Sequence, residues 1–156
     1  MKPATWDTLP PLYQQALTQA RTAFAYAYNP YSHFSVGACL ITQTGELITG
    51  TNFENASYTS ICAERAALVR ANVMGHRTFQ AMAIIAKGIS NTTEVCAPCG
   101  TCRQAIYEAA QLSGGNLELI LSTTQCDKIV LTDIRTLLPM AFGPKDLNID
   151  VTHWTI

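Results

Sequence analysis

Two short cysteine-containing segments constrain this chain more than any other feature, because both must reach the same point in the fold. Cys62 and Glu64 lie in the first segment, and Cys99, 37 residues after Cys62, is followed by Cys102 in the second. Three thiolates can hold a zinc ion and leave its fourth position open, which is typical of a catalytic site. A water in that position loses a proton near neutral pH, and Glu64 can take up that proton. The sequence thus predicts a catalytic zinc with Cys62, Cys99 and Cys102 as ligands and Glu64 as the catalytic residue.

Both segments lie where a helix is expected to begin, over residues 61–74 and 98–112. Residues three apart in a first turn share a face, so Cys99 and Cys102 can reach one ion. The positive end of each helix also favours the thiolate form of a cysteine. We therefore expect the two helices to direct their N-termini at the same metal, with one zinc per chain.

Two arginines beside the cysteines are candidates for offsetting the negative charge of three thiolates on one zinc ion. Arg65 follows Glu64 directly, and Arg103 follows Cys102. A guanidinium group can donate several hydrogen bonds to ligand sulfurs. The alternative is that Arg65 is only an exposed helix residue. We favour Arg65 as a neighbour of the zinc ligands and take Arg103 as a second candidate.

The cysteines could also form three other kinds of site. The series Cys96, Cys99 and Cys102 resembles the start of a bacterial iron–sulfur run, but this chain has Ile106 where that run needs a further cysteine. A structural zinc with Cys96 as a fourth ligand is a second possibility, and a redox pair at Cys99 and Cys102 is a third. None of these gives a role to Glu64, so we favour the catalytic zinc.

The composition argues against several classes of function. A chain of 156 residues fits one domain over residues 1–156. Its net charge of −1 and its scattered cations predict no nucleic-acid partner, and no apolar run approaches the ~20 residues of a membrane helix. Six cysteines without an export signal predict a cytoplasmic protein with reduced thiols. Cys39 and Cys126 have no partner at metal-binding spacing, so we expect both to lie outside the site.

Hydrophobic periodicity and turn residues predict a mixture of helices and strands. Helices are expected over residues 12–28, 61–74 and 98–112, with a short helical piece over residues 133–138. Strands are expected over residues 35–42, 47–53, 81–86, 117–122 and 128–131. This order predicts an α/β fold with three layers, α-β-α, around a mixed five-stranded sheet.

Five blocks of the sequence resemble the short-chain, homotetrameric cytidine deaminase family of zinc-dependent nucleoside deaminases. The blocks follow the family's order over residues 31–38, 52–58, 62–65, 98–104 and 137–142. Five blocks in order are far more specific than one pair of cysteines. The resemblance implies a cytidine-deaminase-like fold. It also implies hydrolytic deamination of cytidine and 2′-deoxycytidine to uridine and 2′-deoxyuridine in pyrimidine salvage.

The resemblance implies roles at the matching positions. The three cysteines and the glutamate of the predicted zinc site match the family's ligands and its proton shuttle. Asn52 and Glu54 match the pair that binds the sugar, chiefly its 3′-hydroxyl. The other substrate-binding positions that the resemblance implies are Phe34, Tyr58, Ala63 and Phe142. In family homotetramers Phe142 would reach a neighbouring subunit's site, although core packing is the simpler interpretation of Phe34 and Phe142 without the resemblance. The family's ligand pattern holds no counterpart for His33, His76 or His153.

The chain departs from the family at three places, one of which is the span between the two cysteine segments, which is a few residues longer than is common. Only three residues separate Tyr58 from Cys62, where related sequences usually have four. Residues 1–11 and the tail after Leu147 are additions without an inferred purpose.

Two alternatives to cytidine deamination stay open at this point. The first is deamination of a modified or antibiotic aminonucleoside by the same mechanism, and the second is non-catalytic binding of zinc or an iron–sulfur cluster. We expect a free nucleoside rather than a nucleotide, because no Gly-rich loop or pair of cations flanks residues 52–58.

Overall fold

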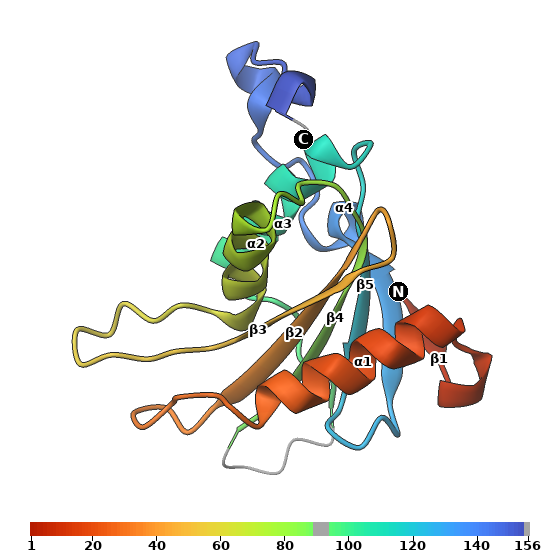
Figure 1. The fold of residues 1–156 in the computed structure, drawn as a ribbon, viewed down its shortest axis with the longest axis vertical. Helices are drawn as coiled ribbons and strands as arrows, with labels where there is room; N and C mark the ends of the chain where they lie inside the picture. Colours follow the sequence, from red (N-terminus) through yellow and green to blue (C-terminus); the bar gives the residue numbers. More distant parts are fainter. Residues whose placement is uncertain (89–93, 155–156) are drawn as a thin grey trace.

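The computed structural model describes residues 1–88 and 94–154, and its centre is a mixed sheet of six strands (Figure 1). The strands are β1 (Lys2–Ala4), β2 (Ser35–Thr42), β3 (Leu47–Thr51), β4 (Phe79–Lys87), β5 (Glu118–Ser122) and β6 (Ile129–Asp133). They lie in the order β1-β6-β5-β4-β2-β3. The pair β4 and β5 is parallel, and the other neighbouring pairs are antiparallel.

Helices cover both faces of this sheet, as the sequence predicts (Figure 1). One face carries α1 (Pro11–Phe24), and the other carries α2 (Ala63–Val73) and α3 (Gly100–Leu112). The remaining helical pieces are α4 (Ile134–Leu137), η1 (Trp6–Thr8), η2 (Pro144–Leu147) and η3 (Thr152–Trp154). Among the described residues, no helix has the length and apolar character needed to cross a membrane.

Strand β2 shows how the two layers of helices share one sheet. Successive side chains of a strand point to opposite faces. Ala38 and Leu40 therefore pack into the core beneath α2 and α3, whereas Cys39 and Ile41 pack into the core beneath α1. Cys39 is fully buried there, so the prediction that it lies outside the site holds.

A glycine in β3 fixes the position of α2, the helix that begins beside Cys62. A Cβ atom on Gly50 would lie 2.3 Å from the backbone nitrogen of Ala67 and 2.4 Å from the carbonyl oxygen of Ala63. No side chain fits in that space, so only glycine lets α2 lie directly on the sheet. The start of α2 is thereby held against β3, and the functional side chains on its first turn are held with it.

The prediction of five strands is wrong by one, because residues 2–4 form the edge strand β1. Lys2 pairs with Leu131 and Ala4 pairs with Ile129 in an antiparallel register. Leu9, which follows this strand in the sequence, is only 5% exposed and packs into the core beneath α1. The addition at the N-terminus therefore covers the edge of β6, where unpaired backbone groups would otherwise meet solvent.

Several predicted boundaries move by a few residues. The first helix ends at Phe24 rather than at Tyr28, because Tyr28 forms a parallel bridge with Phe53. The third helix begins at Gly100, with Cys99 as its N-cap. The polar sequence over residues 88–93 predicts a loop, and residues 89–93 lie outside the described part of the chain.

Candidate active site

The structure brings the three predicted zinc ligands together at the starts of two helices. Cys62 and Cys99 are the N-cap residues of α2 and α3, and Cys102 lies in the first turn of α3. Their three Sγ atoms lie within 4.8 Å of one another, and the Sγ atoms of Cys62 and Cys99 are 3.9 Å apart. A tetrahedral zinc with bonds of about 2.3 Å would separate its sulfur ligands by about 3.8 Å. The cluster therefore fits a zinc ion, and within the described residues it does not include Cys96.

The ionisation of these groups also calls for a cation. Burial, helped by the nearby charge of Glu64, raises the pKa of the Cys102 thiol. Thiolates and a carboxylate this close repel one another, so they ionise together only where a positive charge offsets them. A divalent metal supplies that charge and takes the deprotonated form of each cysteine as its ligand.

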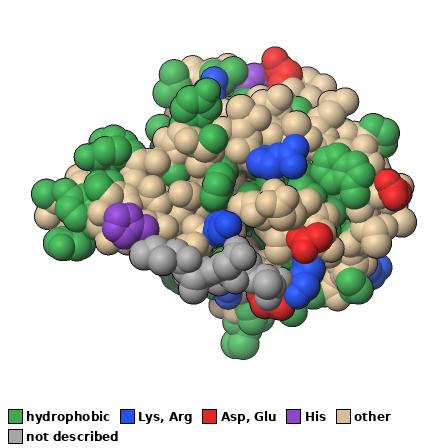
Figure 2. Space-filling model, turned by 90° about the horizontal axis from the view of Figure 1, so that it is seen from below, with side chains coloured by type: hydrophobic (Ala, Val, Ile, Leu, Met, Phe, Trp, Pro, Cys, Tyr) green, Lys and Arg blue, Asp and Glu red, His purple; other side chains and the backbone are tan. Residues whose placement is uncertain are grey.

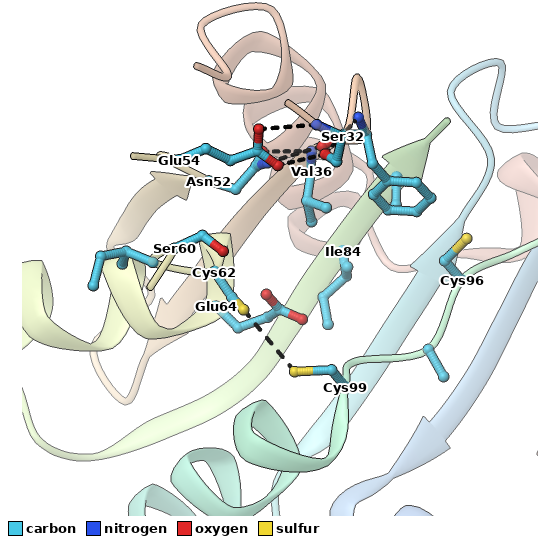
Figure 3. Close-up of a pocket in the computed structure, with 14 residues that line it drawn as sticks. Ser32, Val36, Asn52, Glu54, Ser60, Cys62, Glu64, Ile84, Cys96 and Cys99 are labelled. Atoms are coloured by element: carbon cyan, nitrogen blue, oxygen red, sulfur yellow. Dashed lines mark hydrogen bonds between the residues drawn. The ribbon is translucent and has the colours of Figure 1, made fainter. Parts of the chain in front are cut away.

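Glu64 lies in the first turn of α2 beside the cysteine sulfurs (Figure 3). Its side chain lines the same cavity as Cys62 and Cys99, and the residue is only 4% exposed. Burial raises the pKa of Glu64, while hydrogen bonds from its own backbone and from Cys102 and the charge of Arg65 oppose that shift. A carboxyl group whose pKa is raised toward neutrality is suited to taking up and releasing a proton.

The two arginines differ in what they contact. Arg65 donates from Nη2 to Cys62 Sγ at 3.8 Å and to the carbonyl oxygen of Ser60 at 3.0 Å, which is the kind of contact that the sequence predicts. Arg103 donates from Nε to the carbonyl oxygen of Pro98 at 2.8 Å and from Nη1 to that of Leu137 at 3.0 Å. Arg103 thus ties the start of α3 to α4, and these two hydrogen bonds go to carbonyl oxygens rather than to sulfur.

A cavity of ≈ 490 Å³ connects the cysteines to the loop over residues 29–34 and the end of β3 (Figure 3). Six of the predicted site residues line it, namely Phe34, Asn52, Glu54, Cys62, Glu64 and Cys99. Its volume falls within the range of about 300–1,000 Å³ that small-molecule sites occupy. We call the part beside the cysteines the metal end and the part beside Asn52 and Glu54 the far end.

The polar side chains at the far end are held by hydrogen bonds to the backbone. Asn52 accepts from the Val36 N–H at 2.8 Å through Oδ1 and donates from Nδ2 to the Phe34 carbonyl at 2.8 Å. Glu54 accepts from the backbone N–H groups of Tyr31 at 2.9 Å and Ser32 at 3.1 Å through Oε2. The Ser32 hydroxyl donates to Glu54 Oε1.

Those hydrogen bonds also set the charge of Glu54. The bond from the Ser32 hydroxyl, followed by the backbone N–H groups of Tyr31 and Ser32 and the charge of His33, lowers the pKa of Glu54. Glu54 is therefore an ionised acceptor at neutral pH.

Three of the predicted substrate-binding residues are not among those that line this cavity. Ala63 is fully buried in the core beneath α2 and α3. Tyr58 is 80% exposed and lines a neighbouring cavity of ≈ 270 Å³. The centroid of its ring lies 5.6 Å from that of the Tyr31 ring. Phe142 is 61% exposed on the C-terminal part of the chain, beside Gln104, whose Nε2 donates to the Phe142 carbonyl.

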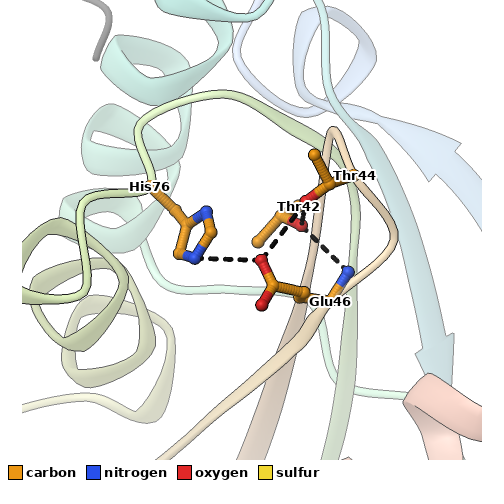
Figure 4. A network of polar contacts seen from close by, with 4 residues as sticks. All are labelled: Thr42, Thr44, Glu46 and His76. Carbon is orange, nitrogen blue, oxygen red and sulfur yellow. Dashed lines mark hydrogen bonds and ion pairs between the residues drawn. The ribbon is translucent and has the colours of Figure 1, made fainter.

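The three histidines are likewise absent from the residues that line the cavity. His76 follows α2, and its Nε2 lies 3.0 Å from Glu46 Oε2 in a polar network with Thr42 and Thr44 (Figure 4). His153 lies 3.5 Å from Asp150 near the C-terminus, in an exposed pair.

Sequence reasoning missed several residues of the cavity wall, which are Ser32, Val36, Ser60, Ile61, Ile84, Ala86, Cys96 and Ala97. A signal existed for some of them. Ile84 and Ala86 are two residues apart in a predicted buried strand, so their side chains are expected on the same face of the sheet. Ser32 gave no comparable signal, because its contact with Glu54 joins residues 22 positions apart.

A family model supports the assignment of the metal end. Residues 11–112 match the model described as "Cytidine and deoxycytidylate deaminase zinc-binding region", and this range contains the three clustered cysteines and Glu64.

Curated relatives and solved structures point the same way. Over 136 residues the chain is 40% identical to a cytidine deaminase of Halalkalibacterium halodurans, covering 86% of this chain and 97% of that one. It is 37% identical to a cytidine deaminase of Sporosarcina psychrophila over 136 residues, which are 86% of this chain and 94% of that one. A crystal structure of cytidine deaminase from Burkholderia pseudomallei matches with a TM-score of 0.73 and 40% identity, covering 82% of this chain and 97% of that chain. On these matches the chain belongs to the cytidine deaminase family, and its α/β fold and cysteine zinc site are those of that family.

Proposed function

We propose that this chain is a zinc-dependent aminohydrolase that converts cytidine and 2′-deoxycytidine to uridine and 2′-deoxyuridine in pyrimidine salvage. One observation carries the proposal: a buried glutamate lies with two of the three clustered cysteines at one end of a cavity whose other end presents an ionised carboxylate. Two relatives that share 37% and 40% of the aligned residues are named cytidine deaminases, which supports the same reaction.

In this reaction Glu64 moves the protons. Cys62, Cys99 and Cys102 would hold the zinc ion, which would supply an acidified water as the nucleophile for C4 of cytosine. Glu64 takes one proton from that water and passes it to N3 of the base. It then carries a second proton from the new C4 hydroxyl to the departing amino group, so that one water is consumed and one ammonia is released. Arg65, through its hydrogen bond to Cys62, offsets the charge of the thiolates.

The far end of the cavity would hold the sugar. Glu54 presents an ionised carboxylate that can accept a hydrogen bond from the 3′-hydroxyl, and Asn52 keeps one amide hydrogen beyond the bond that it makes to Phe34. Phe34 lines the same cavity and would pack against the base. The Ala63 backbone and Tyr58 are further candidates for substrate contact.

We further propose that the protein assembles as a homotetramer in the cytoplasm, without a nucleic-acid or membrane partner. Exposed apolar side chains support an assembly, and Figure 2 shows several hydrophobic patches on one face of the molecule. The C-terminal part alone exposes Met140, Phe142, Leu147, Ile149 and Trp154. In a tetramer Phe142 would reach the cavity of a neighbouring subunit. Thiols that bind zinc must stay reduced, which suits the reducing conditions of the cytoplasm.

The test is a side-by-side assay of ultraviolet absorbance and ammonia release. Cytidine, 2′-deoxycytidine, their monophosphates, cytosine, adenosine and a base-modified aminonucleoside would be compared on one preparation of measured zinc content. We expect turnover of the two nucleosides and little turnover of the others. A zinc-loaded, folded protein that left both nucleosides unchanged would refute the proposal.

A further inference from the structure

Ser32 lies where the loop over residues 29–34 meets the far end of the cavity. It lines the cavity together with Glu54 and Phe34 (Figure 3). The loop is tied to the strand end opposite by hydrogen bonds between the backbones of Tyr28 and Glu54 and between the Asn52 side chain and the backbones of Phe34 and Val36. The backbone around Ser32 is therefore already held in place without its hydroxyl.

The Ser32 hydroxyl makes two hydrogen bonds of different kinds. It donates to Glu54 Oε1, and it accepts from the Phe34 backbone N–H at 3.0 Å. A hydroxyl has only one hydrogen to donate, so that hydrogen is committed to the carboxylate. One small side chain thus connects the proposed sugar-binding carboxylate with the backbone of the residue that would pack on the base.

The two oxygens of Glu54 are used unequally. Oε2 accepts from two backbone N–H groups, those of Tyr31 and Ser32, and so both of its lone-pair directions are occupied. Among the described residues, Oε1 accepts only from the Ser32 hydroxyl, which leaves one lone pair for a ligand. The bond from Ser32 holds the Oε1 side of the carboxylate and so helps to fix the direction in which that lone pair points.

We infer that Ser32 is a positioning residue for sugar recognition, and that it acts by aiming Glu54 Oε1 at the 3′-hydroxyl of the nucleoside. The inference rests on the proposed function, since it assigns a role within the same site. It makes a prediction that a purely structural serine would not: the contribution of Ser32 to binding depends on whether the substrate carries that hydroxyl.

The experiment compares cytidine with 3′-deoxycytidine, which lacks only the 3′-hydroxyl, in wild-type protein and in Ser32→Ala. Losing a hydrogen bond to an ionised acceptor typically weakens an interaction roughly 10- to 150-fold. We expect KM for cytidine to rise by about that factor in Ser32→Ala, with kcat changed less. For 3′-deoxycytidine, which cannot use Glu54, KM should be nearly the same in both proteins. Ser32→Thr keeps the hydroxyl and should restore the wild-type KM for cytidine.

Ser35→Ala is the matched control, because it removes another hydroxyl from the same region. Ser35 Oγ accepts from Asn29 Nδ2 at 3.1 Å and does not line the cavity. Any change in KM that Ser35→Ala causes should therefore be equal for cytidine and 3′-deoxycytidine.

The outcomes separate the inference from the function beneath it. Inactivity of the wild-type protein on both substrates would refute the proposed function, and the inference with it. Activity with an equal KM change for both substrates in Ser32→Ala would overturn the inference alone. If Ser32→Ala does not fold, Ser32→Cys carries the same test, because a thiol keeps the size but is a weak donor. Failure of both variants to fold would also overturn it, since the hydroxyl would then be needed for the fold.

Discussion

The two ends of the cavity are built in different ways. At the metal end, the cysteines and Glu64 occupy the N-caps and first turns of α2 and α3, so the helices themselves place the functional side chains. At the far end, Asn52 and Glu54 follow β3 and are held by hydrogen bonds with the loop over residues 29–34 and with Val36 at the start of β2. Helix starts packed on a sheet resist distortion, whereas a loop held by side-chain hydrogen bonds can yield locally. Substitutions at the metal end should therefore abolish activity, whereas substitutions at the far end should reduce activity only partly.

The first prediction concerns the substitution with the largest expected effect, the removal of one zinc ligand at the metal end. Cys99→Ser keeps the shape of the side chain but removes a soft thiolate ligand from the cluster. We expect zinc content to fall from about one per chain to near zero, with turnover lost and a lower melting temperature, because metal binding contributes to folding. Zinc analysis and a melting curve on the same preparation measure both effects.

Cys96→Ser is the matched control for the cysteine change. Cys96 also lines the cavity, but its sulfur is not part of the group within 4.8 Å. Its replacement should leave zinc content unchanged. Loss of zinc in Cys96→Ser would instead support a closed structural site with four ligands.

The second prediction separates chemistry from metal binding at the same end. Glu64→Gln keeps size and polarity but cannot accept a proton. General acid–base catalysis contributes roughly 10²–10⁴-fold, and a residue that serves several proton transfers should lie near the upper limit. We expect zinc, fold and nucleoside binding to persist while turnover falls by that factor.

Ammonia release, zinc content and melting would be measured together on Glu64→Gln. Glu94→Gln is the control, because Glu94 lies on the surface in an ion pair with Lys128. A folded, zinc-loaded Glu64→Gln protein within tenfold of wild-type activity would contradict the proposed mechanism.

The same contrast explains how much the sequence could predict. The ligand cluster followed from local rules, because helix starts at Cys62 and Cys99 set the direction of nearby side chains whatever the rest of the fold does. Most strands followed from hydrophobic patterns for the same reason. Strand β1 did not, because three residues that include Pro3 carry no readable alternation and are defined by pairing with β6, more than a hundred positions away.

The far end was harder to predict for a physical reason. The resemblance supplied Asn52 and Glu54, but the residues that orient them, above all Ser32, act through contacts between segments about 20 positions apart. Arg103 illustrates the same limit, since its position beside Cys102 suggested a sulfur contact and the fold instead directs it to two carbonyl oxygens. The roles assigned to Asn52, Glu54, Tyr58, Ala63 and Phe142 stay predictions.

The third prediction tests whether a substitution at the far end reduces activity without abolishing it. Glu54→Ala leaves the 3′-hydroxyl of a bound nucleoside without its acceptor, and it also unpairs the N–H groups of Tyr31 and Ser32. Unsatisfied polar groups cost about 1–3 kcal/mol, which corresponds to roughly a 5- to 150-fold loss in kcat/KM for cytidine. Zinc content should not change. Wild-type activity on cytosine, which lacks the sugar, should be very low, and cytosine turned over as fast as cytidine would refute the role of Asn52 and Glu54.

The charge of Glu54 gives that prediction a pH dependence. Its pKa is lowered by the bond from Ser32, so the carboxylate is charged above its ordinary pKa of about 4.3 and its contribution is lost only as pH falls through the lower value. The KM of wild-type protein for cytidine should therefore show no titration of Glu54 between about pH 5 and 8. A rise in KM toward pH 5 that is absent from Glu54→Ala would contradict the assignment.

The last prediction, with the smallest expected effect, concerns Phe142, which does not line the cavity of its own chain. Phe142 is 61% exposed, so its truncation should remove little packing from the chain that carries it. If the protein assembles so that Phe142 enters a neighbour's cavity, Phe142→Ala should raise KM for cytidine about 5-fold, which is the lower end of the 1–3 kcal/mol that loss of an apolar contact in a pocket costs. Trp154→Ala is the control, because Trp154 is an exposed aromatic of the same C-terminal part that lines a different groove between α2 and α3. Gel filtration under assay conditions reports the assembly, and a fully active monomer would show that each chain completes its own site.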